Sequence, residues 1–466
     1  MAESGTGAHI LVFPYPAPGH MLPLLDLTHH LAIRGLSITI LVTPKNLSIL
    51  TPLLSNHPVA IKTLILPFPS HPSIPTGVEN AKDMPFSAFN HFMLALGDLH
   101  DPILDWFHNH PSPPVAILSD LFLGWTNHLA GELGIRRYVF SPTGALGLSV
   151  INSLWCYFPK RDDPTNENSL ISFPNISNSL TFPWWQLSSI YRSYVKGDPT
   201  WEFVKDGLCA NMASWGVVVN SFTELDRVYF DHIIAEFGHD RVFAVGPLLP
   251  PANNVVERGG SGSSEVMSWL DTCAARTVVF VSFGSQFVLT NKQMERIALG
   301  LERSGVKFVW AVKGPTGGHD VEEYGKIPAG FENRVAGRGL VVRGWVPQVA
   351  ILSHESVAAL LTHCGWNSVL EAVVAGVLLL TWPMSADNFS NAKLLHELGI
   401  GIKACEGGET VPDPVEFTVL LRKSVSEETR VERNRVAKFA VAAKKAVGEG
   451  GSSWRDLDRL VLNLSQ

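Results

Sequence analysis

The sequence predicts an α/β protein with two domains, each built around a largely parallel sheet. Short apolar runs alternate with helical stretches, as they do when strands and crossover helices follow one another. The alternation is interrupted by PPANNVVERGGSGSSE (250–265), a Pro, Gly and Ser-rich stretch typical of a linker, and then restarts. The length of 466 residues also exceeds what one ordinary core supports. We therefore expect domains at 1–248 and 266–448, a linker at 249–265 and a final helical segment at 449–466.

The first half opens with a βαβ unit. HILVFPYP (9–16) is a nearly continuous apolar run, which predicts a strand buried on both faces of a parallel sheet. Helical spacing follows over 21–35 and ends at Gly35, and LSITILVTP (36–44) predicts the next strand. The segment from 155 to 200 is rich in Pro, Asn and Ser, and predicts loops with short helices. The remaining strands of this half are predicted at 113–120, 136–144, 215–221 and 241–249.

The second half repeats the same alternation. Strands are predicted at 277–285, 306–312, 339–345 and 376–383, and helices at 291–304, at 366–375 and from 387. Open parallel sheets bind their ligands at the carboxyl ends of their strands. Two such sheets therefore predict a small-molecule site in a cleft between the domains.

Composition excludes several classes of protein. Hydrophobic residues make up 46% of the chain and charged residues 17%, which fits a globular protein. The formal net charge of −7 argues against nucleic acid as a partner. The cysteines lie far apart without a CxxC pair, which favours a reducing compartment; they are Cys156, Cys209, Cys273, Cys364 and Cys405. The first residues have no basic region, and no apolar run is long enough to span a membrane, so we expect a cytoplasmic protein without membrane insertion.

The stretch LLTHCGWNSVLEAVVAGVLLLTWPMSADN (360–388) raises the question of a binding site. A metal site is disfavoured, because the adjacent His363 and Cys364 can hardly point at one ion and no second pair has ligand spacing. A glycine after an apolar strand and before a helix instead predicts a phosphate site, because exposed N–H groups at a helix start attract anions. Gly365 would allow close approach of the backbone.

Three side chains around this helix start can donate further hydrogen bonds: His363, Asn367 and Ser368. Helix capping by Asn367 or Ser368 is the alternative, and Glu371 follows Ser368 at the spacing of a capping-box variant. The surroundings favour a phosphate ligand. GWVPQ (344–348) supplies an aromatic side chain that can stack on a nucleotide base, and the Asp-Asn pair at 387–388 can bind the hydroxyls of a sugar. In this order, the groups match the parts of a nucleotide sugar.

The segment from Trp345 to Asn388 closely resembles the signature box of plant UDP-dependent glycosyltransferases of secondary metabolism. PAPGHMLPLLDL near the start, SFGS (282–285) and GGSSWRDLDRL near the end extend the resemblance over the whole chain. The segments at 64–80 and 113–126 resemble the subgroup that acts on flavonoids and hydroxybenzoates.

This resemblance implies the GT-B fold, in which two Rossmann-like domains face each other across a cleft. The first domain would hold the acceptor, the second the donor, and the last segment would pack back on the first domain. The implied reaction is metal-independent, inverting transfer from a UDP-sugar, with UDP-glucose expected first, to a hydroxyl of a small plant phenolic. The UDP-sugar would be a co-substrate, with no cofactor and no metal, and we expect a monomer.

The resemblance also assigns catalytic roles. His20 follows the first strand, and it would take the proton of the acceptor hydroxyl as that oxygen attacks C1 of the sugar. Asp120 ends its own strand and would orient the imidazole. From the residues alone, Asp120 could equally be a helix cap or a turn residue.

By the same resemblance, Trp345 stacks on uracil, Val346 contacts it, and Gln348 and Glu371 reach the ribose. The other expected donor-binding residues are Gly19, Thr143, Ser285, His363, Gly365, Trp366, Asn367, Ser368, Asp387 and Asn388. Asn388 departs from the family, in which Gln is usual among glucose users. Its shorter side chain admits UDP-rhamnose, UDP-xylose or UDP-arabinose as alternative donors.

Aromatic residues in the first half could line a flat acceptor site or simply pack together; they are Phe86, Phe89, Phe92, Trp184, Trp185 and Tyr191. Two other functions stay open. A non-catalytic UDP-sugar-binding protein would keep the box without needing His20 and Asp120. A nicotinamide oxidoreductase is suggested by the alternation alone, and its nearest fingerprint, GIGIKA (399–404), follows a helix rather than a strand.

Overall fold

The computed structural model describes residues 7–84, 86–178, 180–250, 263–285, 287–315 and 322–466. The chain divides into two compact units. Unit 1 comprises Met1–Leu249 with Lys445–Gln466, and unit 2 comprises Pro250–Lys444. Most of the linker predicted at 249–265 lies outside the described residues, but helix α10 (Ser263–Asp271) begins within its last positions.

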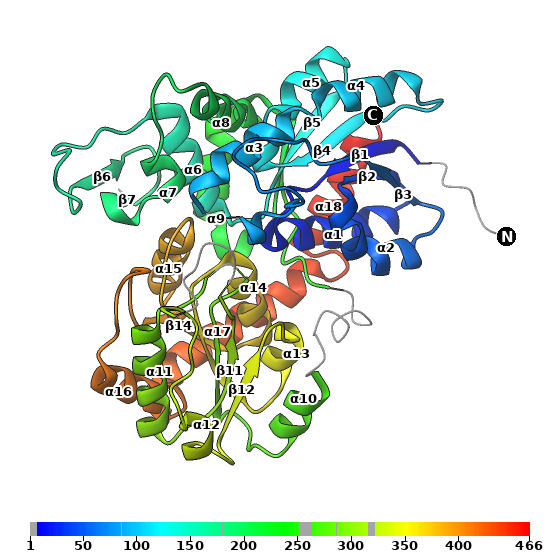
Figure 1. Cartoon of the computed structure of the whole chain (residues 1–466). Coiled ribbons are helices and arrows are strands. Elements are labelled where there is room, and N and C mark those ends of the chain that lie inside the picture. The colour runs from blue at the N-terminus through cyan, green and yellow to red at the C-terminus, as the bar shows by residue number, and fades with distance from the viewer. Residues whose placement is uncertain (1–6, 85, 179, 251–262, 286, 316–321) are drawn as a thin grey trace. The chain divides into compact units, whose positions relative to one another are not determined.

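In the described part of unit 1, seven strands form one sheet in which every neighbouring pair is parallel (Figure 1). In spatial order they are β3 (Ile61–Ile65), β2 (Ser37–Val42), β1 (His9–Phe13), β4 (Ala116–Asp120), β5 (Arg136–Ser141), β8 (Gly216–Val219) and β9 (Val242–Ala244). The helices are α1 (Pro18–Ala32), α2 (Thr51–Asn56), α3 (Phe89–Gly97), α4 (His100–Asn109), α5 (Thr126–Glu132), α6 (Ala145–Tyr157), α7 (Ser189–Arg192), α8 (Pro199–Ala210), α9 (Thr223–Phe237) and α18 (Ser452–Leu464).

The register of the central strands positions the site of unit 1. Phe13 at the end of β1 pairs with Ser119 of β4, and Asp120 pairs with Phe140 of β5. The carboxyl ends of β1, β4 and β5 therefore lie side by side at one edge of the sheet. Helix α1 starts from this edge with Pro18 in its first turn, where the fixed φ of proline suits a helix start. This start places His20 in the first turn of α1.

The last helix, α18, belongs to the core of unit 1. Figure 1 shows it in red beside the blue and cyan strands of that unit. Leu457, Leu460 and Leu464 are buried with residues of β1, β2 and β4 in one apolar cluster. Asp456 accepts a hydrogen bond of 2.8 Å from the backbone N–H of Ala244 in β9. The end of the chain thus supplies apolar packing and an edge hydrogen bond to the first unit.

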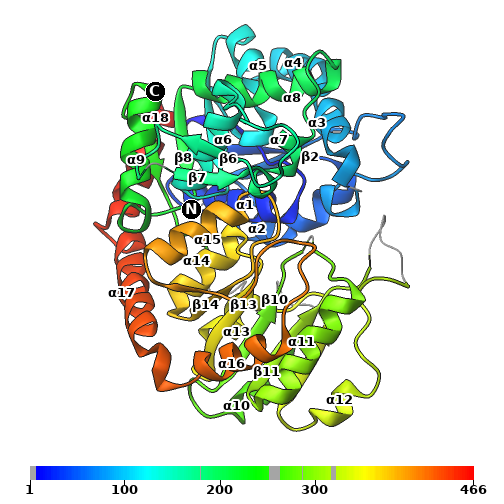
Figure 2. The same cartoon turned by 90° about the vertical axis from the view of Figure 1, so that its left-hand side faces the viewer.

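In the described part of unit 2, six strands form a second parallel sheet. In spatial order they are β12 (Gly339–Arg343), β11 (Lys307–Val312), β10 (Val278–Ser282), β13 (Val357–Thr362), β14 (Leu378–Thr381) and β15 (Gly401–Lys403). The helices besides α10 are α11 (Asn291–Ser304), α12 (Phe331–Arg334), α13 (Gln348–Ser353), α14 (Trp366–Ala375), α15 (Asn388–Glu397), α16 (Pro414–Ser424) and α17 (Arg430–Val447), of which α11 and α16 pack side by side (Figure 2).

The helices with the clearest end signals match their predicted bounds. Helix α11 begins with a capping box between Thr290 and Gln293 and ends at Gly305, which has a φ of +71°. Helix α14 ends at Gly376, with a φ of +70°. Glycine adopts this left-handed conformation without a steric cost, so both helices stop where the sequence predicts.

The middle of unit 1 differs from its prediction as a loop region. Helix α6 continues through Tyr157, and β6 (Leu170–Phe173) and β7 (Leu180–Pro183) form an antiparallel hairpin. Buried and exposed side chains alternate along β6, which is typical of a strand with one buried face. Each strand has only four residues, too few for this period to stand out among Pro, Asn and Ser.

The role of α18 yields a stability prediction. Leu460 is fully buried, so Leu460→Ala removes packing from the core of unit 1 and should lower its free energy of unfolding by about 2–5 kcal/mol. Leu462→Ala on the same helix changes a side chain that is 64% exposed and should cost less than about 0.5 kcal/mol. Denaturant unfolding of both variants checks this. Equal losses would contradict the assignment of α18 to the core.

Candidate active site

His20 and Asp120 meet at the carboxyl edge of the unit 1 sheet. The Nδ1 atom of His20 lies 2.9 Å from Oδ2 of Asp120, although the residues are 100 positions apart. The His20 side chain is 20% exposed, and the Asp120 side chain is fully buried. A carboxylate can only accept a hydrogen bond, so Nδ1 of the neutral ring carries the proton and donates it in this bond. The lone pair of the ring is then on Nε2. The arrangement is that of a general base with an orienting partner.

The cap interpretation of Asp120 is compatible with its contact with His20, because its two oxygens have different partners. While Oδ2 contacts His20, Oδ1 accepts a 2.9 Å hydrogen bond from the N–H of Phe122 and caps a short 3-10 helix, η4 (Leu121–Leu123). The buried guanidinium of Arg137 donates to the carbonyl oxygen of Asp120 at 3.1 Å and brings a positive charge close to the carboxylate. These contacts offset the cost of burying a charge.

Aromatic rings surround His20. Phe122 stacks on the imidazole with centroids 4.8 Å apart, and Tyr15 meets it edge-on at 5.3 Å. Phe89 contacts both Tyr15 and Phe122, at 5.9 and 5.1 Å. Burial raises the pKa of Tyr15 well above its ordinary value, so its hydroxyl stays protonated. The predicted acceptor residue Phe89 therefore lies in the aromatic group around the proposed base.

Phe92 is fully buried and lies 5.9 Å from Tyr15 in the same group, whereas Trp184 and Tyr191 belong to a second aromatic group in unit 1. Tyr191 is buried and lies 5.9 Å from Trp184 and 5.6 Å from Trp155, measured between ring centroids. Trp185 follows in the same 3-10 helix, η5 (Trp184–Gln186). Phe86 starts another 3-10 helix, η3 (Phe86–Ala88), and its side chain lies outside the described part of the structure.

In unit 2, the start of α14 differs from the capping interpretation. Gly365 is the N-cap residue, so Asn367 and Ser368 are already inside the helix, and no side chain caps it. Cys364, just before it, adopts a φ of +68°, which is uncommon for a residue with a side chain. The strand-to-helix turn before α14 is therefore tight.

The space beside Gly365 is filled by His363 rather than left open. A Cβ at Gly365 would lie 2.4 Å from Nε2 of His363, and one at Gly284 would lie 2.5 Å from its Cε1. Burial lowers the pKa of His363 to about 4, so the ring is neutral at pH 7. Its Nδ1 is buried and has no partner among the described residues. Two glycines thus hold a neutral imidazole at the helix start.

A hydrogen-bond network links three of the predicted donor residues. The side-chain amide of Gln348 donates to Oγ of Ser368 at 2.9 Å and to Oε2 of Glu371 at 2.7 Å. Its carbonyl oxygen accepts from Oγ of Ser282 at 3.0 Å. Trp345 lies three residues before Gln348 and is 50% exposed. An exposed indole beside a fixed polar network is suited to stacking on a base and binding the attached ribose.

The turn after β14 carries the Asp-Asn pair. Oδ2 of Asp387 accepts a 3.0 Å hydrogen bond from Asn391, which also donates to the carbonyl of Cys364 at 3.0 Å. Asn388 is 4% exposed, and its Oδ1 accepts from the N–H of Ser385 at 3.3 Å. Asn391 therefore connects the two turns of the site, a role that the sequence analysis missed although it lies one helical turn after Asp387.

The remaining predicted donor residues lie at strand ends. Val346 is buried next to Trp345, and Trp366 is the buried first residue of α14. In unit 1, Thr143 is 5% exposed between β5 and α6, and Gly19 is exposed in the first turn of α1. In unit 2, the carbonyl of Ser285 accepts a hydrogen bond from the Lys313 ammonium.

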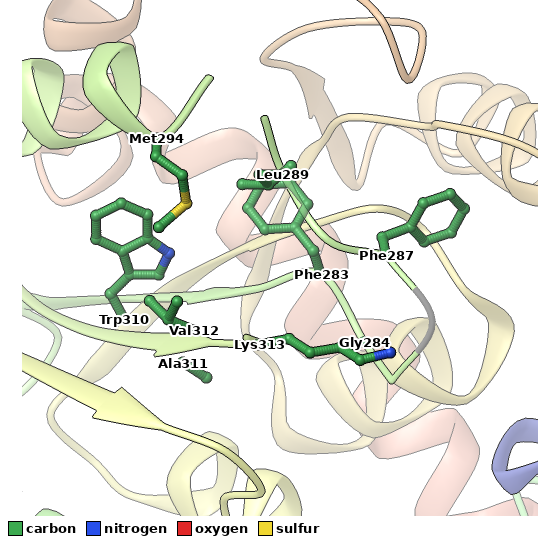
Figure 3. A pocket seen from close by; sticks show the side chains of 9 residues that line it. All are labelled: Phe283, Gly284, Phe287, Leu289, Met294, Trp310, Ala311, Val312 and Lys313. Carbon is green, nitrogen blue, oxygen red and sulfur yellow. The ribbon is translucent and has the colours of Figure 1, made fainter. Parts of the chain in front are cut away.

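A small pocket lies beside Gly284, in the turn after β10 (Figure 3). Its lining consists of Phe283, Gly284, Phe287, Leu289, Met294, Trp310, Ala311, Val312 and Lys313. Figure 3 shows the Lys313 side chain extending toward Gly284, the residue that also contacts His363. The pocket thus borders the predicted donor residues of unit 2.

The described ranges contain no group of three or more His, Cys, Asp or Glu side chains arranged to hold a metal ion. None of their helices combines the length and the apolar character needed to cross a bilayer.

Comparisons with known proteins bear on the family of this chain. Residues 255–413 match the family described as UDP-glucoronosyl and UDP-glucosyl transferase. UDP-glycosyltransferase 89B2 of Stevia rebaudiana is 66% identical, over 100% of this chain and 99% of the relative. Flavonol 3-O-glucosyltransferase UGT89B1 of Arabidopsis thaliana is 53% identical, over 98% of this chain and 96% of the relative.

Solved structures show the same fold. Arabidopsis thaliana UGT89C1 complexed with UDP-L-rhamnose has a TM-score of 0.81 and 39% identity, covering 99% of this chain and 100% of that one. The same protein complexed with quercetin has a TM-score of 0.80. The two parallel-sheet units are the Rossmann-like domains of the GT-B fold. With relatives this similar over their full lengths, the chain belongs to the UDP-glycosyltransferase family.

Proposed function

We propose that this enzyme transfers a sugar, with inversion, from a UDP-sugar to a hydroxyl of a flavonol-like phenol. The observation that carries the proposal is the contact of 2.9 Å between His20 and the buried Asp120 at a sheet edge. A protein that only binds a UDP-sugar has no need for an oriented imidazole, so this pair favours an enzyme. The five free cysteines fit a cytosolic location, and we propose that the enzyme acts there as a monomer.

In the proposed step, Nε2 of His20 takes the proton of the acceptor hydroxyl as its oxygen bonds to C1 of the sugar. The bond between C1 and the β-phosphate oxygen breaks, and UDP leaves with the electron pair. Asp120 stabilises the imidazolium that forms. An unperturbed imidazole has a pKa of about 6.5 and a phenol about 10, so the proton transfer becomes favourable as the new bond forms.

The charge that develops on UDP needs donors that are already in place. We assign this role to the first N–H groups of α14 and to His363, whose neutral ring is fixed by Gly284 and Gly365. The helix dipole adds a partial positive charge at the same point. The uracil would stack on Trp345 and the ribose would bind to Gln348 and Glu371, so the proposed donor site follows the segment from Trp345 to Asn388.

UDP-glucose is the proposed donor, with UDP-rhamnose, UDP-xylose and UDP-arabinose as alternatives. The 53% identical relative is a flavonol 3-O-glucosyltransferase, whereas the relative solved with UDP-L-rhamnose is 39% identical. Asn388 is 4% exposed, and its Oδ1 binds its own turn at Ser385. The sugar contact in this turn therefore falls mainly on the carboxylate of Asp387, which Asn391 orients.

The acceptor is proposed to lie against the aromatic group around His20. Phe89, Phe122 and Tyr15 offer ring edges and faces next to the imidazole. A flat phenol gains both burial and edge-to-face contacts from such rings. This proposal agrees with the flavonol named for the 53% identical relative and with the quercetin bound to UGT89C1.

The role of His20 is tested by His20→Ala. Turnover should fall by about 10²–10⁴-fold, because the acceptor loses its general base, while UDP affinity stays unchanged. Product mass with a flavonol acceptor and calorimetric titration with UDP measure the two effects. His128→Ala is the matched control, because His128 contacts Asp206 at 2.8 Å on the surface and is 54% exposed. Full activity of the His20 variant would refute the assignment.

The role of Asn388 is tested by crossing UDP-glucose, UDP-rhamnose, UDP-xylose and UDP-arabinose with a panel of flavonols. The wild type should prefer glucose, and Asn388→Gln should change this preference by less than about tenfold, because one hydrogen bond is worth about 1 kcal/mol. Affinity for UDP serves as the internal control. A wild-type preference for rhamnose or a pentose that Asn388→Gln moves to glucose would assign donor selection to Asn388.

The role of Thr143 is tested through Gly147 on α6. A Cβ at Gly147 would lie 2.4 Å from Oγ1 of Thr143, so Gly147→Ala should displace the Thr143 hydroxyl and raise the KM for the UDP-sugar several-fold. Thr143→Ala should have a similar effect, and the double variant should not add to it. Gly131→Ala is the control, because nothing lies within 4 Å of a Cβ there. Unchanged kinetics in both single variants would exclude Thr143 from donor binding.

A further inference from the structure

Two partly exposed cysteines lie next to each other in unit 1. Cys156 is near the end of α6 and Cys209 near the end of α8, and their sulfur atoms are 3.7 Å apart. Both are free thiols and neither is fully buried, whereas Cys273, Cys364 and Cys405 are at most 9% exposed. The contact joins helices that are far apart in sequence, and neither side chain has a role in the proposed reaction.

The surroundings make Cys209 the more reactive thiol. A hydrogen bond from the Cys156 thiol lowers the pKa of Cys209 and outweighs burial, which raises it; the charges of Lys205 and Asp206 act in opposite directions. Its sulfur also lies 3.2 Å from the carbonyl oxygen of Trp155. This oxygen accepts a hydrogen bond from the thiol when Cys209 is neutral. A thiolate is the nucleophile in thiol oxidation, so Cys209 is expected to react first.

We propose that Cys156 and Cys209 are a site of reversible oxidation, where a peroxide converts the two thiols into a disulfide. The Cys209 thiolate attacks a peroxide oxygen, forms a sulfenic acid and releases hydroxide or alkoxide. The Cys156 thiol then attacks the sulfenic sulfur, the S–S bond forms, and the sulfenic oxygen takes the thiol proton and leaves as water. In total, two thiols and hydrogen peroxide give one disulfide and two waters. The two sulfur atoms are 3.7 Å apart and must approach to about 2.05 Å to form the S–S bond, which requires rotation of the two side chains.

The disulfide would close a loop around a particular part of unit 1. The two cysteines are 53 positions apart, and the segment between them, 157–208, contains the β6–β7 hairpin, Trp184, Trp185 and Tyr191. Trp155, next to Cys156, already packs edge-on against Tyr191 at 5.6 Å. A cross-link at the base of this segment would restrict its movement and stabilise unit 1, because a closed loop has less freedom when unfolded.

The experiment uses the reduced full chain, treated with hydrogen peroxide and then analysed by thiol titration and non-reducing peptide mapping. Free thiols should fall from five to three, one peptide should link Cys156 to Cys209, and dithiothreitol should restore all five. Cys156→Ser should instead leave a sulfenic acid on Cys209 that dimedone traps, and Cys405→Ser should cross-link like the wild type. A link between other cysteines, or oxidation of these two without a link, would overturn the proposal.

Two further measurements test the restraint itself. The oxidised chain should unfold about 5 °C or more above the reduced one, and proteolysis within 157–208 should slow several-fold. A disulfide that changes neither the unfolding temperature nor the rate of proteolysis would contradict the proposed restraint of segment 157–208. These readouts need no transferase activity, so they stand or fall separately from the proposed function. With a flavonol acceptor, oxidation should change the acceptor KM and leave UDP affinity unchanged.

Discussion

The site of unit 1 depends on one buried carboxylate, that of Asp120. A fully buried charge is stable only when its lone pairs are satisfied and an opposite charge lies close. Three strands and their loops supply these partners: the loop after β1 brings His20, the turn after β4 brings the N–H of Phe122, and β5 brings Arg137. The parallel order β1–β4–β5 thus brings together the groups that stabilise the buried charge of Asp120, and it places His20 beside that charge.

Unit 2 meets a different requirement, because its proposed ligand is an anion that needs exposed N–H groups. The turn before α14 leads into a helix start without a side-chain cap, and Cys364 in this turn has an unfavourable conformation. Asn391 donates hydrogen bonds both to Cys364 in this turn and to Asp387 in the next one. These bonds help to hold Cys364 in its strained conformation. Rigid donors of this kind stabilise developing charge better than mobile ones, because they need not reorganise during the reaction.

The sequence predicts what depends on local pattern and misses what depends on contacts across the fold. The bounds of α11 follow from its capping box and terminal glycine, the end of α14 follows from Gly376, and the sheet strands follow from apolar runs. Arg137 and Asn391 could not be recognised as site residues, because an arginine in a strand and an asparagine in a helix have no local signal. The contact of His20 with Asp120, 100 positions away, was predicted from the family resemblance and not from the spacing.

Competing interpretations of one residue need not exclude each other. The sequence allows Asp120 to be a cap or a partner of His20, and in the structure one oxygen forms the cap while the other contacts His20. The hydrogen bond from Phe122 to Oδ1 fixes the orientation of the carboxylate, and this orientation lets Oδ2 contact His20. The cap therefore supports the proposed catalytic role. Gly365 follows the same logic, since the Cβ it lacks makes room for the imidazole of His363. In both places, the residue that shapes the backbone also sets the position of an imidazole in the proposed site.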